Sequence, residues 1–222
     1  MSHRLAVLIS GGGTNLQAIL DAIGDGRLPA EVALVVSNRA DAGGLERARK
    51  AGVPAAVVPH RDYPDRESFD RALISTLDPA RPDTVVLAGF MRILTPVLVN
   101  HYRGRMINIH PSLLPRHRGL HTHERALAEG DTEHGCSIHF VTEELDGGPL
   151  IAQARVPVQT NDTVETLSKR VQEKEHELYP LVLRWRAENR LRLTEQGAEL
   201  DGRLLGEQGW QLTTVAESAP ER

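Results

Sequence analysis

The sequence predicts an α/β fold built on an open, mostly parallel, doubly wound sheet. Short apolar runs alternate with segments of helical spacing through the first half of the chain. These runs are apolar throughout, as is typical of strands that helices cover on both faces. Glycine-rich or polar turns separate them. Together the three observations favour βαβ units and a parallel sheet.

The first half of the chain supplies five strands and three helices. Runs such as "RLAVLIS" and "DTVVLAG" predict strands at residues 4–10, 31–37, 55–58, 83–89 and 105–110. The segments between them place apolar residues three or four positions apart, which predicts helices. These helices cover residues 16–23, 43–52 and 66–77.

The second half departs from this pattern. It predicts a loop at 111–120, a short helix at 121–129, a strand pair at 136–141 and 149–158, and a long helix from about 161 to 188. Asn161 and Asp162 are candidate N-caps of the long helix, and Glu165 follows Asp162 at the capping-box spacing. The tail from about residue 191 is polar and glycine-rich and is expected to pack loosely.

The composition excludes several classes of protein. The 222 residues carry a formal net charge of −4, so no basic excess indicates nucleic-acid binding. Cys136 is the single cysteine, which suits a reducing compartment. No apolar run is long enough for a membrane span, and the N-terminal run is too short for a signal peptide. We expect a cytoplasmic protein without membrane or nucleic-acid partners.

The first candidate site is "SGGGTN", residues 10–15, between a predicted strand and a predicted helix. Its backbone amides and the positive end of the helix dipole would bind a phosphate. The spacing lacks the third glycine of the dinucleotide fingerprint and the Lys-Ser/Thr of a P-loop, so a simple phosphate monoester is favoured over NAD. The alternative is a turn that only connects two elements.

The second candidate site is the pair Asn108 and His110, at the carboxyl end of a predicted central strand. Residues two apart on a strand point to one face, and ligands bind at this edge of open α/β sheets. An amide donor beside an imidazole suits a developing oxyanion and a proton transfer. The alternative is an Asn that caps a turn beside a half-buried His.

Asp146 and the histidines are weaker signals. Asp146 precedes a Gly-Gly turn and by itself reads as a turn residue, but near His110 it could orient the imidazole. "HTHE", residues 121–124, lacks the spacing of a helical zinc site, and the cysteine has no partner, so no catalytic metal is expected.

Five segments of the chain resemble the phosphoribosylglycinamide formyltransferases, folate-dependent enzymes of purine biosynthesis. They are "SGGGTNLQAI" (10–19), "LAGFMRIL" (87–94), "NIHPSLLP" (108–115), "HGCSIHFVTEELDGG" (134–148) and "QEKEHELYP" (172–180). They occur in the same order and spacing as in that family. The resemblance implies a Rossmann-like formyltransferase domain over residues 1–190, with residues 191–222 as an extension packed on it or partly loose.

The resemblance also implies a role for each motif. Asn108, His110 and Asp146 match the catalytic residues. Gly13, Thr14 and Asn15 match the phosphate loop, and Glu175 matches the residue that holds the ribose hydroxyls. The residues that match folate-contacting stretches are Arg66, Met91, Arg92, Ile93, Leu94, Thr142, Glu143, Glu144 and Leu145. The implied substrates are 10-formyltetrahydrofolate and glycinamide ribonucleotide, with neither metal nor NAD, and a homodimer is compatible with the resemblance.

Two features depart from the family pattern, and three functions compete. Gly12 stands where the family often has Asn or Thr, and His117 stands where an aromatic residue is common. A formyltetrahydrofolate hydrolase shares the Asn–His–Asp chemistry but usually has a further N-terminal domain. A methionyl-tRNA formyltransferase would need a basic tRNA surface. A phosphate-ligand sensor would not need all three catalytic residues.

Overall fold

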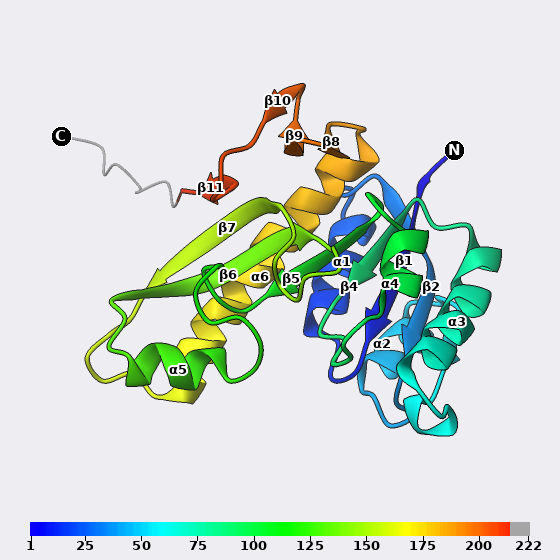
Figure 1. The fold of residues 1–222 in the computed structure, drawn as a ribbon, viewed down its shortest axis with the longest axis horizontal. Coiled ribbons are helices and arrows are strands. Elements are labelled where there is room, and N and C mark those ends of the chain that lie inside the picture. The colour runs from blue at the N-terminus through cyan, green and yellow to red at the C-terminus, as the bar shows by residue number, and fades with distance from the viewer. Residues whose placement is uncertain (214–222) are drawn as a thin grey trace.

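The computed structural model describes residues 1–213 and contains one eight-stranded sheet covered by helices on both faces (Figure 1). The order of the strands is β11-β7-β6-β5-β4-β1-β2-β3. The strands are β1 (His3–Ile9), β2 (Ala30–Ser37), β3 (Ala55–Val57), β4 (Thr84–Leu87), β5 (Met106–His110), β6 (Glu133–Phe140), β7 (Leu150–Pro157) and β11 (Trp210–Leu212). The predicted fold class is confirmed.

Strands β1 to β5 are mutually parallel, whereas β6 runs antiparallel to both β5 and β7. The chain builds the sheet outward from β1 to β3 and then returns to the other side of β1 with β4. This reversal opens a crevice at the carboxyl ends of β1 and β4. The predicted functional residues that follow β1 and β4, or lie at the end of β5, are thus brought to one edge of the sheet.

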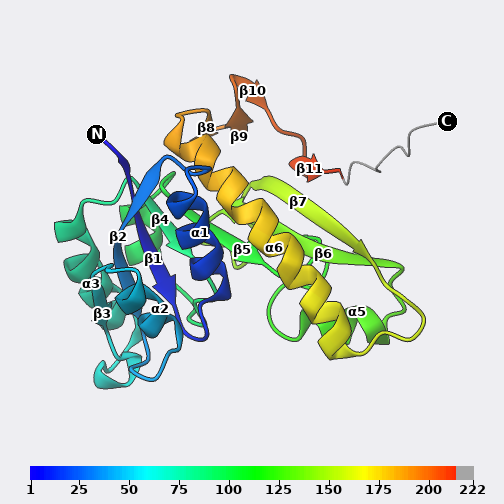
Figure 2. The same cartoon turned by 180° about the vertical axis from the view of Figure 1, so that it is seen from behind.

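Two apolar cores explain why the strands read as continuous apolar runs. In β1, Leu5, Val7 and Ile9 face one core, while Ala6 and Leu8 face the other. Helices α1 (Thr14–Gly24), α2 (Gly44–Lys50), α5 (Thr122–Ala128) and α6 (Val164–Ala187) cover the first face, and α3 (Arg66–Leu77) and α4 (Pro96–His101) cover the second (Figures 1 and 2).

Helix α6 begins later than the sequence pattern indicates. Thr163, not Asn161 or Asp162, is its N-cap, and it forms a capping box with Thr166. Asp162 instead bonds to the guanidinium of Arg170, about two turns further along the chain. The N-cap prediction was therefore wrong: a nearby arginine that can neutralise the acid outweighs the capping preference of Asp.

Four short strands in the tail were not predicted. β8 (Leu191–Thr194), β9 (Gly197–Leu200) and β10 (Arg203–Leu204) form a small antiparallel sheet, and β11 joins the edge of the main sheet beside β7. Trp210 of β11 packs edge-on against Trp185 of α6, with ring centroids 5.2 Å apart. The last part of the expected extension, residues 214–222, lies outside the described residues.

Candidate active site

A cleft of about 1080 Å³ lies at the carboxyl ends of β1, β4 and β5. Segments far apart in the sequence form its walls: the loops after β1 and β4, the end of β5, the loop between β6 and β7, and one turn of α6. Every residue predicted to be functional lines this cleft: Gly13, Thr14, Asn15, Arg66, Met91, Arg92, Ile93, Leu94, Asn108, His110, Thr142, Glu143, Glu144, Leu145, Asp146 and Glu175. Folding therefore assembles the predicted residues into one site.

The glycine loop after β1 leads directly into helix α1. Gly13 is the N-cap, with φ at +72°, and a Cβ at this position would lie 2.7 Å from Cα of Gly44. Both the left-handed backbone and the close approach require glycine. The first amides of α1 have no acceptor within the helix and carry its positive dipole end. This part of the cleft is suited to bind a phosphate group.

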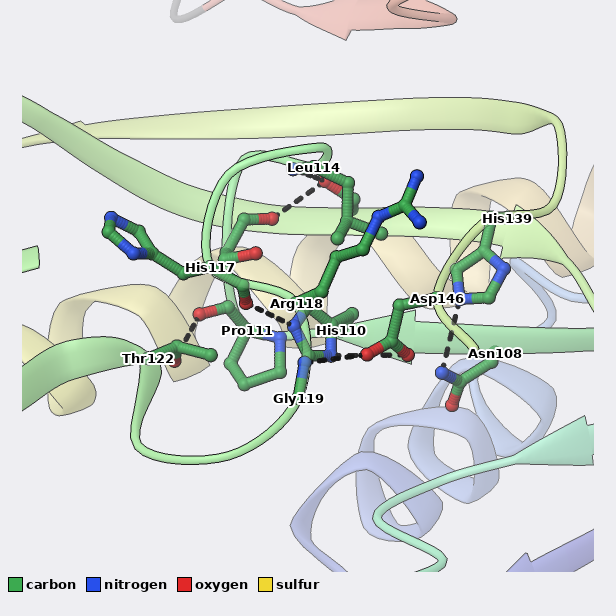
Figure 3. Close-up of polar contacts among 12 residues, drawn as sticks. Asn108, His110, Pro111, Leu114, His117, Arg118, Gly119, Thr122, His139 and Asp146 are labelled. Atoms are coloured by element: carbon green, nitrogen blue, oxygen red, sulfur yellow. Dashed lines mark hydrogen bonds and ion pairs between the residues drawn. The ribbon is translucent and has the colours of Figure 1, made fainter. Parts of the chain in front are cut away.

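Asn108 is held by a residue that sequence reasoning missed, His139 of β6. The two residues face each other across the β5–β6 pair, and Nδ2 of Asn108 lies 3.2 Å from Nε2 of His139 (Figure 3). Nδ1 of His139 donates to the carbonyl oxygen of Phe140 at 2.9 Å, so Nε2 is the accepting nitrogen. Burial lowers the pKa of His139, which keeps the ring neutral. The Asn108 amide is thus oriented, and its second N–H is available to a ligand.

His110 lies between a backbone carbonyl and Asp146. Its Nε2 donates to the carbonyl oxygen of His117 at 2.9 Å, because a carbonyl can only accept. Its Nδ1 therefore faces Oδ1 of Asp146, at 3.6 Å (Figure 3). The other carboxylate oxygen accepts from the amide of Gly119 at 2.8 Å. Both side chains are more than nine-tenths buried, so the pair is shielded from solvent. A proton on Nδ1, or a water between the two groups, would satisfy this geometry.

The loop that follows His110 is held by buried polar side chains. Oγ of Ser137 accepts from the amide of Leu114 and donates to the carbonyl oxygen of Ser112. Gln153 donates to Leu114 O and to the same Ser137 hydroxyl. Nε2 of Gln211, from β11, donates to Oε1 of Gln153 at 3.2 Å. This network fixes the loop whose carbonyl oxygen holds His110, and it reaches the C-terminal strand.

Another part of the cleft is an apolar slot with two arginines. Met91, Ile93 and Leu145 remain more than half exposed, which is unusual for large apolar side chains outside a binding site. Arg66 and Arg92 lie beside them, and Nε of Arg92 is buried without a partner among the described residues. An apolar slot with a few placed polar groups is typical of sites for planar organic ligands.

Glu175 of α6 reaches the glycine loop and accepts from Nδ2 of Asn15 at 3.2 Å. Burial raises the pKa of this carboxyl to about 7, and the hydrogen bond from Asn15 opposes the rise only in part. Oδ1 of Asn15 is also buried, with no partner in the described part of the chain. Two oxygens that accept hydrogen bonds thus lie together beside the glycine loop, where hydroxyl groups of a ligand could donate to them.

The raised pKa of Glu175 predicts a dependence of stability on pH. The folded state binds the proton more tightly than the unfolded state, whose carboxyl keeps its ordinary pKa of 4.5. Stability is therefore lost as the pH rises from 4.5 towards 7. Glu175→Gln should raise the melting temperature at pH 8.5 and bring little change at pH 4.5. The exposed Glu173→Gln on the same helix is the control, and equal effects at both pH values would contradict the prediction.

Three residues that could ligate a metal meet outside the cleft. In the described part of the chain they are His117, Glu129 and Asp131. Nε2 of His117 lies 2.7 Å from Asp131, and Nδ1 lies 3.8 Å from Glu129, so the two carboxylates meet opposite sides of the ring. Both ring nitrogens of His117 therefore face a carboxylate beside the loop that follows His110.

Comparisons with known proteins identify the family to which the chain is similar. Residues 3–183 match the family model described as formyl transferase. The chain is 54% identical over 206 residues to phosphoribosylglycinamide formyltransferase of Escherichia coli, an alignment that covers 93% of this chain and 97% of that protein. It is 46% identical over 194 residues to the human trifunctional purine biosynthetic protein adenosine-3, of which it spans 19%.

Solved structures show the same architecture. A phosphoribosylglycinamide formyltransferase from Coxiella burnetii superposes with a TM-score of 0.92 at 52% identity and covers 96% of this chain and 100% of that chain. Glycinamide ribonucleotide transformylase 1 from Symbiobacterium toebii superposes with a TM-score of 0.87 at 48% identity, over 90% of this chain and 94% of that chain.

Proposed function

The chain belongs to the formyl transferase family, and from this premise we propose that it transfers a formyl group from 10-formyltetrahydrofolate to the amine of glycinamide ribonucleotide. The observation that carries the proposal is the cleft itself. It joins the glycine loop, which is suited to a phosphate, and an apolar slot, and Asn108, His110 and Asp146 line the same cleft. The enzyme is a phosphoribosylglycinamide formyltransferase of purine biosynthesis that uses a formyl-folate.

The nucleotide is proposed to occupy the end of the cleft beside α1. Its phosphate accepts hydrogen bonds from the backbone amides of Gly13, Thr14 and Asn15. Its ribose hydroxyls donate to Glu175 and to the unpartnered oxygen of Asn15. This pose directs the glycinamide amine towards Asn108 and His110. The folate is proposed to fill the apolar slot formed by residues 91–94 and the 142–145 loop, with Arg66 and Arg92 available to its carboxylates.

The reaction requires charge stabilisation and one net proton transfer. The amine nitrogen attacks the formyl carbon, and the carbonyl electrons move onto oxygen to form a tetrahedral oxyanion. The free N–H of Asn108 donates to this oxygen, and the side chain of His110, held beside Asp146, is the second polar group at the reacting centre. Asp146, through a water, accepts the proton from the attacking nitrogen and returns it to N10 of the folate as the carbon–nitrogen bond breaks. The products are the formylated nucleotide and tetrahydrofolate.

The competing functions are less well supported. The relatives described above are transferases, so the comparisons favour transfer to an amine over hydrolysis. A hydrolase also has no need of an anion-binding loop beside the catalytic Asn. No metal and no nicotinamide takes part in the proposed steps, since oxygen and nitrogen lone pairs carry all of the chemistry.

The first expected result concerns the acceptor. The purified protein should release tetrahydrofolate from 10-formyltetrahydrofolate rapidly only when glycinamide ribonucleotide is present, because the amine is the nucleophile. Absorbance of the folate product and mass spectrometry of the nucleotide measure the two products. Equal rates of deformylation with and without the nucleotide would contradict transfer and favour the hydrolase.

No helix among the described residues is both long and apolar enough to cross a bilayer. We propose a cytoplasmic location, which suits purine biosynthesis, and a homodimer, which is compatible with the family resemblance.

A further inference from the structure

We propose that Arg47 of α2 is a positioning residue that orients the phosphate-binding amide of Gly13. The inference rests on the proposed function and deepens it, since Arg47 acts through the loop instead of touching the nucleotide. Nε of Arg47 donates to the carbonyl oxygen of Gly12 at 2.6 Å. One step earlier in the loop, the amide of Gly44 donates to the carbonyl oxygen of Gly11 at 2.9 Å. Two consecutive loop carbonyls are thus held by the same helix.

Because the peptide group is planar, a hydrogen bond that fixes a loop carbonyl also fixes the direction of the N–H group that follows it. In a trans peptide the C=O and the following N–H point in opposite directions. A hydrogen bond that turns the Gly12 carbonyl towards α2 therefore turns the N–H of Gly13 away from α2. The loop lines the cleft, whereas no described residue of α2 does so. The amide of Gly13 accordingly points towards the cleft, where the phosphate is proposed to bind.

The loop has little stiffness of its own. Residues 11–13 are all glycine and have no side chains to restrict the backbone. Helix α2 packs against them without a gap: a Cβ on Gly44 would lie 2.5 Å from Cδ1 of Ile9 and 3.2 Å from Cα of Gly13. The close packing brings α2 within reach, and the two hydrogen bonds set the peptide planes. A flexible all-glycine loop thereby becomes a preorganised anion site.

Arg47→Ala is expected to raise the Michaelis constant for glycinamide ribonucleotide about tenfold, the scale of one lost charge-assisted hydrogen bond. The Michaelis constant for the folate and the turnover at saturating substrate should change little, because the substitution leaves the apolar slot and Asn108 unchanged. Arg49→Ala, which removes an exposed arginine paired with Glu46 on the same helix, is the matched control. Equal increases in both constants, or an unchanged constant for the nucleotide in a folded variant, would overturn the proposal.

Arg47→Lys separates position from charge. It keeps the positive charge but moves the donor one atom further along the side chain, so most of the effect of Arg47→Ala should persist. If Arg47→Lys had the wild-type Michaelis constant for glycinamide ribonucleotide, the positive charge alone would suffice and the positioning role would be wrong.

Binding of inorganic phosphate tests the inference without the reaction. Phosphate should raise the melting temperature of the wild type and of Arg49→Ala, and should raise that of Arg47→Ala much less. Phosphate stabilisation that is equal in all three proteins would contradict the role of Arg47. A wild type that binds phosphate in an Arg47-dependent way but transfers no formyl group would instead refute the proposed function alone.

Discussion

Replacing Asp146 by asparagine is expected to lower turnover by about 100-fold or more, which is the scale of a lost proton-transfer group. The variant keeps the size of the side chain, and its oxygen can still accept from the amide of Gly119. It removes the negative charge 3.6 Å from Nδ1 of His110. The lost interaction matters most when a proton moves and charge develops, so both Michaelis constants should change little.

The measurement for Asp146→Asn is steady-state turnover and both Michaelis constants, each followed from about pH 5 to 10. Asp201→Asn is the matched control, because Asp201 has nearly the same backbone conformation, with φ at +52° against +51°, and lies in an exposed turn paired with Arg190. If the variant kept near-normal turnover with the same dependence on pH as the wild type, Asp146 would be only a turn residue.

Replacing Asn108 by alanine is expected to lower turnover by about 10²- to 10³-fold, the usual cost of one oxyanion donor. The amide is held by neutral His139, so its free N–H is aimed at the reacting oxygen before substrate binds. The oxyanion exists only along the reaction path, and binding of the ground-state substrates should therefore persist.

Two further variants serve as comparisons for Asn108→Ala, one beside Asn108 and one far from the cleft. His139→Ala removes the acceptor that orients the amide but leaves the donor, so its turnover should fall less than that of Asn108→Ala. Asn161→Ala changes an exposed asparagine before α6 and should leave turnover unchanged. A loss for Asn108→Ala that appears mainly as a raised Michaelis constant would assign Asn108 to substrate binding instead of to the transition state.

Sequence patterns predicted the regular elements where the apolar period was strong. β1, β2, β4 and β5 were found because strands that are buried on both faces must be apolar throughout. The pattern failed for α4, whose six residues are too few to establish a helical period. It failed also for β8 to β11, because strands of two to four residues are too short to establish an alternating apolar pattern. Strand β11 depends in addition on its pairing with β7, which is far from it in the sequence.

The site shows the same division between local and distant effects. A glycine loop before a helix, an Asn and a His two residues apart on a strand, and an acid before a Gly-Gly turn are local patterns, and the sequence by itself determined them together with the fold class. Only the tertiary structure decided which nitrogen of His110 faces Asp146, that His139 orients Asn108, and that Arg47 holds the glycine loop. These contacts join residues that are 31 to 36 positions apart in the sequence. Hydrogen bonds depend on the direction of the donor and acceptor as well as on their distance. Residue type and spacing along the chain carry no information about that direction until the sheet brings the partners together.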